Sequence, residues 1–353
     1  MLFASPWRLP DSPAPVHGGP DELGLAQFDF SSNANAAGPL ASVAQAVRAA
    51  PRENYPDPGY HRLRRHLGEW HGVDPDRIVV AASGSEFIQR FTRCAALWRG
   101  IACAWVPRPG YGDYARAAQS AGLVVQSYDS LSELWPEPPR GALAWFTQPS
   151  SPAGETRAGQ LAPVVRAVVA ENGIAVLDLA YQPLRLIEAE AHPEFASARE
   201  LAWQLFSPNK ACGLTGVRGA YAIAPAGQEA VAQALGRVAA SWVLGAEGVA
   251  MLQAFAQVQA QSELQEQLGL LSQWRGLLVS ELRALGWQEE SGLSVTPFFL
   301  ARPPRGLDLV RLRAAGIKLR ETASLGLPGW VRISAQRPAA VAALITALKE
   351  AEA

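Results

Sequence analysis

One lysine in the middle of the chain follows an apolar run and is surrounded by small residues. Lys210 lies in the segment FSPNKACGLTGVRGAY, directly after residues typical of a buried strand. An ammonium group is costly to desolvate unless it is paired or chemically converted. A Schiff base removes that cost, because the amine becomes a covalent tether for an aldehyde cofactor. The alternative is a lysine on a surface loop, which the lysine by itself does not exclude.

Groups suited to binding a phosphate occur near this lysine and at an earlier turn. Ser207 shortly precedes Lys210 and Arg218 shortly follows it, with glycines in between. Ser83-Gly84-Ser85 lies between an expected strand and an expected helix, where free backbone N–H groups and two hydroxyls can bind an anion. Ser83 and Glu86 also form an S-x-x-E capping box, which needs no ligand. The two interpretations are compatible.

The motif S-x-x-K-(x)7-R with interleaved glycines resembles the cofactor-lysine segment of fold-type I pyridoxal-phosphate enzymes. It is most similar to the branch of histidinol-phosphate aminotransferases and threonine-phosphate decarboxylases, and the similarity extends from about Val16 to Ala335. The resemblance implies pyridoxal 5′-phosphate as cofactor, with Lys210 as its covalent anchor and proton carrier. It also implies a set of phosphate ligands: Ser83, Gly84, Ser85, Ser207 and Arg218. No metal is expected.

The resemblance implies four residues around the cofactor ring. Asp178 ends the run IAVLD, as in the family's D-E-A-Y segment, and its carboxylate would keep the pyridine nitrogen protonated. Tyr181 would form a hydrogen bond with the ring's phenolic oxygen, and Tyr111 in RPGYGDY would lie on the ring face. Ser151 stands where the family usually has asparagine, so a shorter side chain would bind that same oxygen. The alternatives are a helix cap for Asp178 and a core position for Tyr111.

Segments near both ends of the chain match the substrate-binding parts of this branch. The HGG tripeptide at His17 and the segment DFSSNANAAGP resemble the N-terminal region of threonine-phosphate decarboxylases. Asn33 and Asn35 match two asparagines there, and we assign His17 and Asn35 to the substrate site. Arg332 would hold the substrate's α-carboxylate or its equivalent in bidentate fashion, and Arg320 would bind a second anion such as a phosphate. Exposed arginines on edge strands are the alternative.

Tyr55 in the segment NYPDPGY predicts an oligomer. It resembles the tyrosine with which members of this family reach the cofactor phosphate of the neighbouring subunit. The resemblance therefore implies a homodimer with shared active sites. A simple proline turn explains the same residues equally well.

From residue 77 onward, short apolar runs alternate with amphipathic stretches. Strands are expected at 77–82, 101–106, 143–147, 174–178, 201–206 and 219–223. Helices are expected between them, at 85–98, 111–122 and 162–171. This alternation predicts an α/β three-layer sandwich with a mainly parallel sheet, as in aspartate aminotransferase. Ligands bind beyond the carboxyl ends of such strands, which is where the candidate residues cluster.

The expected domain organisation has three parts. Residues 1–40 form an N-terminal arm with many prolines and glycines, and residues 41–245 form the large pyridoxal-phosphate-binding domain. Residues 246–353 form a long interdomain helix and a smaller α+β domain. In that last part we expect a helix at 247–285, strands at 293–301, 316–320 and 330–334, and helices at 307–315 and 338–351.

Composition excludes several classes of protein. The net charge of −1 and the 18% of charged residues give no electrostatic footprint for nucleic acid or an anionic membrane. No apolar run is long enough to span a bilayer, and no signal peptide is expected. The 3 cysteines lack metal-ligand spacing, which favours reduced thiols in a cytoplasmic protein.

The predicted activity is that of an aminotransferase for a small amino acid or amino phosphate, similar to histidinol-phosphate aminotransferase. The spacing of Arg320 and Arg332 favours it. The alternative is a threonine-phosphate decarboxylase of cobalamin biosynthesis, which the HGG and DFSSNAN segments favour. A nicotinamide oxidoreductase fits the strand pattern, but no G-x-G-x-x-G follows the first strand.

Overall fold

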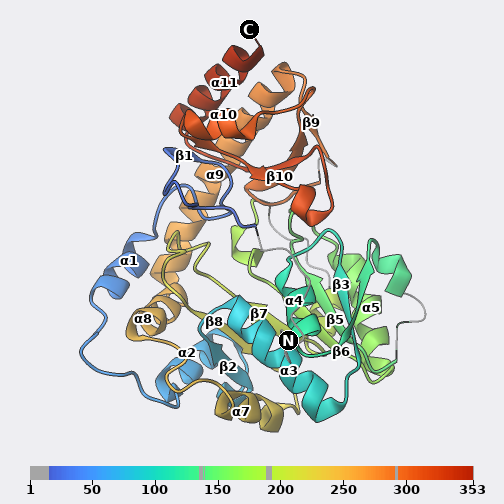
Figure 1. The fold of residues 1–353 in the computed structure, drawn as a ribbon. Coiled ribbons are helices and arrows are strands. Elements are labelled where there is room, and N and C mark those ends of the chain that lie inside the picture. Colours follow the sequence, from blue (N-terminus) through green and yellow to red (C-terminus); the bar gives the residue numbers. More distant parts are fainter. Residues whose placement is uncertain (1–15, 135–137, 139, 188–192, 291–292, 353) are drawn as a thin grey trace, which may run out of the picture.

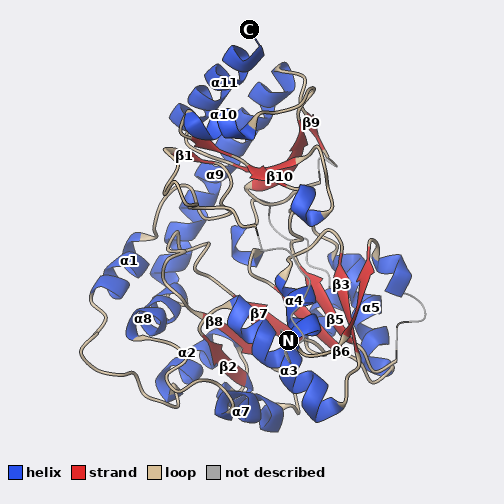
Figure 2. Cartoon of the chain, viewed as in Figure 1, coloured by secondary structure: helices blue, strands red, loops and turns tan. Residues whose placement is uncertain are grey.

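The computed structural model describes residues 16–352 except 135–137, 139, 188–192 and 291–292, so residues 1–15 of the predicted arm lie outside the described residues. A large part built on one sheet is joined by a long helix, α9, to a smaller part that contains the C-terminus (Figure 1). Helices cover the large sheet and one side of the smaller one (Figure 2). Within the described residues, no helix is long and apolar enough to cross a membrane.

The central sheet has seven strands in the order β2-β8-β7-β6-β5-β3-β4. Neighbours are parallel except for β8, which is antiparallel to both β2 and β7. This confirms the predicted mainly parallel sheet. Its strands are β2 (Ile78–Ala81), β3 (Cys103–Pro107), β4 (Val124–Tyr128), β5 (Leu143–Thr147), β6 (Ile174–Asp178), β7 (Trp203–Phe206) and β8 (Ala220–Ile223).

Strands β2, β5, β7 and β8 are buried on both faces, which explains their continuous apolar sequences. On one face pack α3 (Gly84–Arg99), α4 (Asp113–Ser120) and α7 (Glu229–Arg237). On the other pack α1 (Ala41–Arg48), α2 (His61–His71), α5 (Ala158–Ala170), α6 (Pro193–Arg199) and α8 (Ala246–Phe255), with the first part of α9 (Val258–Ala284). Short 3-10 turns occur at η1 (Pro75–Arg77), η2 (Leu131–Leu134), η3 (Gln182–Leu184) and η4 (Ala323–Leu325).

The structure adds one edge strand to the predicted sheet and divides one predicted helix. The edge strand β4 was not predicted, because its outward positions are polar or exposed and no long apolar run marks it. The predicted helix 247–285 is two helices, since the backbone of Gln257 is extended between α8 and α9. The amide of Gln261 donates a hydrogen bond to the carbonyl oxygen of Phe255, which satisfies the end of α8 at this break.

The smaller part holds a four-stranded antiparallel sheet in the order β12-β13-β10-β9. Its strands are β9 (Gln288–Glu289), β10 (Phe298–Arg302), β12 (Arg320–Glu321) and β13 (Val331–Ser334), and its helices are α10 (Leu309–Ala314) and α11 (Pro338–Glu352). The expected strand 316–320 is split, because β11 (Ile317–Lys318) pairs instead with β1 (Phe28–Asp29) of the arm. This strand pairing attaches the arm to the smaller part.

The division into three domains stays a prediction. The packing of α9 indicates where the boundary between the large and the smaller part would lie. In α9, Leu264, Leu268 and Leu271 belong to the core of the large part. Leu278 and Leu282, further along the same helix, belong to the core of the smaller part. The change therefore lies between residues 271 and 278 of α9, later than the predicted boundary at 246.

Candidate active site

Most of the predicted site residues line one cavity of about 750 Å³. It lies beyond the carboxyl ends of the parallel strands, where open α/β sheets bind ligands, and the arm, α4 and strands β12 and β13 close its other sides. The predicted residues that line it are His17, Ser83, Gly84, Ser85, Tyr111, Ser151, Asp178, Tyr181, Ser207, Lys210, Arg218, Arg320 and Arg332. Tyr55 and Asn35 do not.

Lys210 and Asp178 face the same space from neighbouring strand ends. The Nζ atom of Lys210 lies 5.4 Å from the ring centroid of Tyr181. Burial raises the pKa of Asp178, although the hydrogen bond from Tyr114, that from Ala180 and the charge of Lys210 oppose this shift. A buried carboxylate beside an amine is suited to stabilise a cationic ring nitrogen.

Both oxygens of Asp178 are held by donors of the chain. Its Oδ2 accepts a hydrogen bond of 2.7 Å from the hydroxyl of Tyr114, and its Oδ1 accepts one of 3.0 Å from the backbone N–H of Ala180. Tyr114 is fully buried and stacks on Trp145 at 4.9 Å between ring centroids. The carboxylate is thus fixed in orientation before any ligand binds. Tyr114 was not predicted, although it comes three residues after Tyr111 and so falls one helical turn away.

The start of α3 forms an anion cradle. Ser83 is its N-cap and accepts a hydrogen bond of 3.0 Å from the N–H of Glu86, so the predicted capping interaction is present alongside the cavity lining. A Cβ atom at Gly84 would come within 2.8 Å of the Ser207 Oγ atom and fill the space in front of it. The hydroxyl of Ser85 bonds with that of Tyr111 at 2.8 Å. With Arg218 at the mouth, these donors fit a phosphate group.

Arg332 has hydrogen-bonding capacity to spare. Its Nη2 atom donates to the carbonyl oxygen of Ser31 at 2.8 Å, while its buried Nε atom has no partner within the described residues. Burial lowers the pKa of Arg332, and the charge of Arg320 adds to this effect. A buried guanidinium with a free donor favours an anionic ligand such as a carboxylate.

The structure reverses the choice between the two asparagines of the arm. Asn35 is 4% exposed, and its amide donates to the carbonyl oxygen of Ala211 and to Gln267 at 3.0 and 2.6 Å. Asn33 instead lines the cavity: its amide donates to the hydroxyl of Tyr181 at 3.1 Å, and its buried Oδ1 atom has no partner among the described residues. The two residues, separated only by Ala34, face opposite sides of an irregular segment, which the sequence does not show.

Arg320 lines the cavity but its donors are already engaged. Its Nη1 atom bonds with the backbone and side chain of Glu321, and its Nη2 atom donates to Val16 and Ser324 at 2.9 and 3.0 Å. This residue therefore ties the arm to the smaller part. The second anion expected at Arg320 would have to displace these partners.

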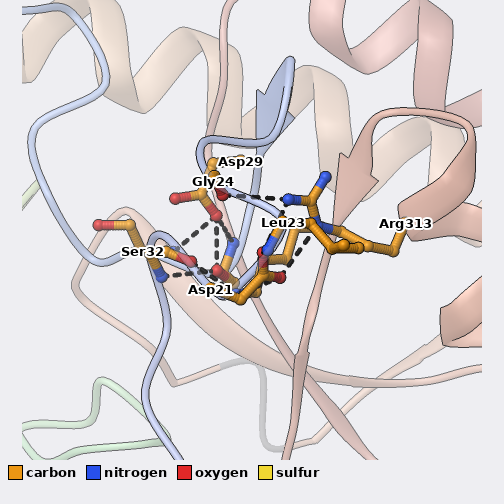
Figure 3. A network of polar contacts seen from close by, with 9 residues as sticks. Asp21, Leu23, Gly24, Asp29, Ser32 and Arg313 are labelled. Atoms are coloured by element: carbon orange, nitrogen blue, oxygen red, sulfur yellow. Dashed lines mark hydrogen bonds and ion pairs between the residues drawn. The ribbon is translucent and has the colours of Figure 1, made fainter.

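A polar network joins the arm to the smaller part (Figure 3). Arg313 donates two hydrogen bonds of 2.9 and 2.8 Å to the carboxylate of Asp21 and one of 3.0 Å to the carbonyl oxygen of Gly24. Lys318 forms an ion pair with Asp21 at 2.9 Å. These cations, Arg313 most of all, hold the pKa of Asp21 far below its usual range. The arm is thus fastened by charge to the smaller part.

Tyr55 lies outside the cavity lining, on the molecular surface. It is 75% exposed and stacks on Trp242 at 4.2 Å between ring centroids. The indole N–H of Trp242 donates to the carbonyl oxygen of Pro56 at 3.2 Å, which fixes the stack to its loop. Tyr55 contributes nothing to the cavity of its own chain.

Comparison with known proteins adds to this geometry. Residues 26–348 match the model of the family "Aminotransferase class I and II". The histidinol-phosphate aminotransferase of Akkermansia muciniphila is 28% identical over 346 residues, covering 93% of this chain and 92% of that protein. Histidinol-phosphate aminotransferase 2 of Caulobacter vibrioides is 30% identical over 353 residues, covering 93% and 87%.

Solved structures share the fold. The histidinol-phosphate aminotransferase from Sinorhizobium meliloti, in complex with pyridoxal-5′-phosphate, has a TM-score of 0.73 at 23% identity, with 90% of this chain and 89% of that one covered. The L-threonine-O-3-phosphate decarboxylase from Porphyromonas gingivalis has a TM-score of 0.75 at 21% identity, with 91% and 98% covered. The predicted fold type is thereby confirmed.

Proposed function

The chain belongs to the class I and II aminotransferases, a family of pyridoxal-phosphate enzymes, and we propose that it transfers the amino group of a small amino acid or amino phosphate. One observation carries this proposal. The amine of Lys210 and the buried carboxylate of Asp178 line a single cavity with Arg332, whose Nε atom has no partner among the described residues. An amine, a carboxylate and a free guanidinium are what such a transfer requires of the protein.

The donors of the cavity fit the cofactor. Bound pyridoxal phosphate supplies an electron sink for the bonds at the substrate's α-carbon. Lys210 would attach to it, Asp178 would face its ring nitrogen, and Tyr111 would lie on its ring. Tyr181 and Ser151 would bind its phenolic oxygen. Its phosphate would be held by Ser83, Gly84, Ser85, Ser207 and Arg218, and the orphan N–H groups of a helix start suit that charge.

The protein's own contribution is orientation and proton transfer. Arg332 binds the substrate's carboxylate and so fixes which bond of the α-carbon reacts. The Nζ atom of Lys210 accepts and returns the α-proton. The 2.7 Å hydrogen bond from Tyr114 lowers the pKa of Asp178 against the effect of burial and keeps its carboxylate aligned. Asn33 holds the hydroxyl of Tyr181 in place through the bond of 3.1 Å.

We also propose that two copies form a homodimer in the cytoplasm. Tyr55 would then reach the cofactor phosphate of the neighbouring subunit. Its exposure and its stacking on Trp242 support this role, because they present the phenol to another molecule in a fixed orientation. Tyr55 does not line the cavity of its own chain, so it has no role there that would compete with this one.

A second candidate, a threonine-phosphate decarboxylase of cobalamin biosynthesis, is favoured by the HGG segment. His17, Gly18 and Gly19 all line the cavity. A Cβ atom at Gly18 would come within 2.1 Å of the carbonyl oxygen of Ser31 and 3.2 Å of Arg332, so this position requires glycine. The tripeptide therefore forms part of the substrate wall.

Incubation with two substrates decides between the candidates. The purified enzyme is given histidinol phosphate with a keto acid, and separately threonine phosphate without one. Amino-acid formation that depends on the keto acid supports the aminotransferase. Release of carbon dioxide from threonine phosphate alone supports the decarboxylase and contradicts our first proposal. Protein that neither absorbs like a pyridoxal-phosphate enzyme nor gains the mass of the cofactor on borohydride reduction contradicts both.

A further inference from the structure

The outer part of the cavity has polar residues with no role in binding the cofactor. One wall is the stripe Ala115, Arg116 and Gln119 of α4. The opposite walls are His17 of the arm and Ser324 of η4. Substrate atoms farthest from the reacting carbon would lie here, because the cofactor's binding groups occupy the strand ends.

Besides Arg218, which is assigned to the cofactor phosphate, three guanidinium groups line the cavity, and they differ in their free donors. Arg320 is engaged by Glu321, Val16 and Ser324. Arg116 is bound on one side only: its Nη2 atom pairs with Asp113, while Nε and Nη1 have no hydrogen-bond partner within the described part of the chain. Arg116 therefore joins Arg332 as a guanidinium able to accept a new anion.

Asp113 makes Arg116 a fixed group and not a mobile surface charge. The side chain of Asp113 is 9% exposed, that of Arg116 is 30% exposed, and the two residues lie one turn apart on α4. The buried carboxylate holds one edge of the planar guanidinium. Because Nη2 carries two N–H groups and Asp113 takes one of them, the edge that Nη2 forms with the nitrogen on its other side stays open for bidentate binding of a carboxylate or phosphate.

His17 shows that a positive field fills this part of the cavity. Partial burial lowers the pKa of His17 most, and the charges of Arg116, Arg320 and Arg332 lower it further, in that order. Every charge that shifts His17 is thus a cation, with Arg116 the strongest. The imidazole of His17, the amide of Gln119 and the hydroxyl of Ser324 add hydrogen-bonding groups to the same part of the cavity.

We propose that α4 forms a second anion subsite, in which Arg116 selects substrates with a phosphate or carboxylate at the end of the side chain. The inference rests on the proposed function, because it concerns the amino substrate of the same cavity. It moves the distal anion from Arg320, where the sequence predicts it, to Arg116. Arg320 would instead be a positioning residue for the arm.

The test compares Arg116→Gln with wild-type enzyme on matched substrate pairs that differ in a side-chain phosphate, threonine phosphate with threonine and serine phosphate with serine. Loss of charge-assisted hydrogen bonds should lower kcat/KM for the phosphorylated member by about 10- to 100-fold. The unphosphorylated member should change less than about threefold. Arg116→Lys should retain part of the selectivity, and Arg93→Gln, on the exposed side of α3, is the matched control. Glutamate carries a carboxylate at the end of its side chain. If the subsite also takes carboxylates, kcat/KM for glutamate should fall in Arg116→Gln as well.

Binding of inorganic phosphate separates this inference from the proposed function. Calorimetric titration of the cofactor-loaded protein should show a site that Arg116→Gln weakens about 10-fold or more and Arg93→Gln leaves unchanged. That result supports the subsite even if none of the substrates is turned over. Equal phosphate binding by wild type and Arg116→Gln, or equal losses for both members of each substrate pair, overturns it.

Discussion

The two ends of the cavity are built in different ways. At the cofactor end, Asp178 and Lys210 follow adjacent strands whose register is fixed by the sheet, with Asp178 paired to Leu205. At the substrate end, Asn33, Arg116 and Arg332 come from an irregular segment, a helix and a strand of the smaller sheet, and contacts with Tyr181, Asp113 and Ser31 set the positions of their side chains. Backbone pairing makes the first end rigid and common to a fold. Side-chain contacts make the second end adjustable, because substitutions there can change the substrate without altering the cofactor site.

The sharpest test of the cofactor end is Lys210→Ala. This variant loses both the covalent anchor and the proton carrier, so kcat should fall by at least about 10⁴-fold, the upper range for general acid–base catalysis. The mass gained on borohydride reduction should disappear. Activity and mass measured together check the prediction.

Lys349→Ala is the control, since Lys349 is exposed on α11 far along the chain. It should keep the mass shift and the wild-type rate. If borohydride reduction still attaches the cofactor to the Lys210→Ala protein at one other site, the assignment of Lys210 as the covalent anchor is wrong.

Arg332→Gln probes the substrate end with the next largest effect. It removes a buried charge and its free Nε donor, so kcat/KM for an amino acid should fall by about 100-fold or more. An amino alcohol, which lacks the carboxylate, should lose much less. Steady-state kinetics with histidine and histidinol measure the difference. Equal losses for both would mean that Arg332 acts through the arm, by its bond to Ser31.

Tyr114→Phe asks whether the rigid end is tuned as well as held. The hydrogen bond from Tyr114 lowers the pKa of Asp178, so its loss should raise that pKa further. Less of the carboxylate is then ionised at a given pH. The acid limb of the kcat profile should move to higher pH, and kcat should fall about 10-fold, the worth of one buried hydrogen bond.

Tyr128→Phe is the matched control, because Tyr128 donates to a backbone carbonyl, that of Trp145, and has no place in the cavity. It should leave the acid limb where it is. If Tyr114→Phe lowers kcat but leaves the acid limb of the kcat profile unshifted, Tyr114 acts only through packing.

The same contrast explains what the sequence could predict. Residues of the cofactor end follow short apolar strands bounded by Gly, Pro and Ser, and strand order then brings them together. The choice between Asn33 and Asn35 depends on an irregular backbone, and Arg320 looks free until its partners Val16 and Glu321 are located. Such side-chain pairings join distant segments and leave no periodic pattern in the sequence.

The smallest effect is expected at the arm's fastening. Asp21→Asn weakens its pairs with Arg313 and Lys318, which should loosen the arm and raise KM about threefold, with kcat unchanged, since partly exposed pairs contribute little. Asp21 has a depressed pKa, so its pairs persist above its ordinary pKa and weaken only as the pH falls well below it. The rise in KM should therefore be independent of pH near neutrality.

Limited proteolysis within residues 16–31 should become faster, whereas Glu22→Gln, at the exposed neighbouring position, should change neither KM nor cleavage. A change in kcat for Asp21→Asn would show that the adjustable end also positions the reacting groups.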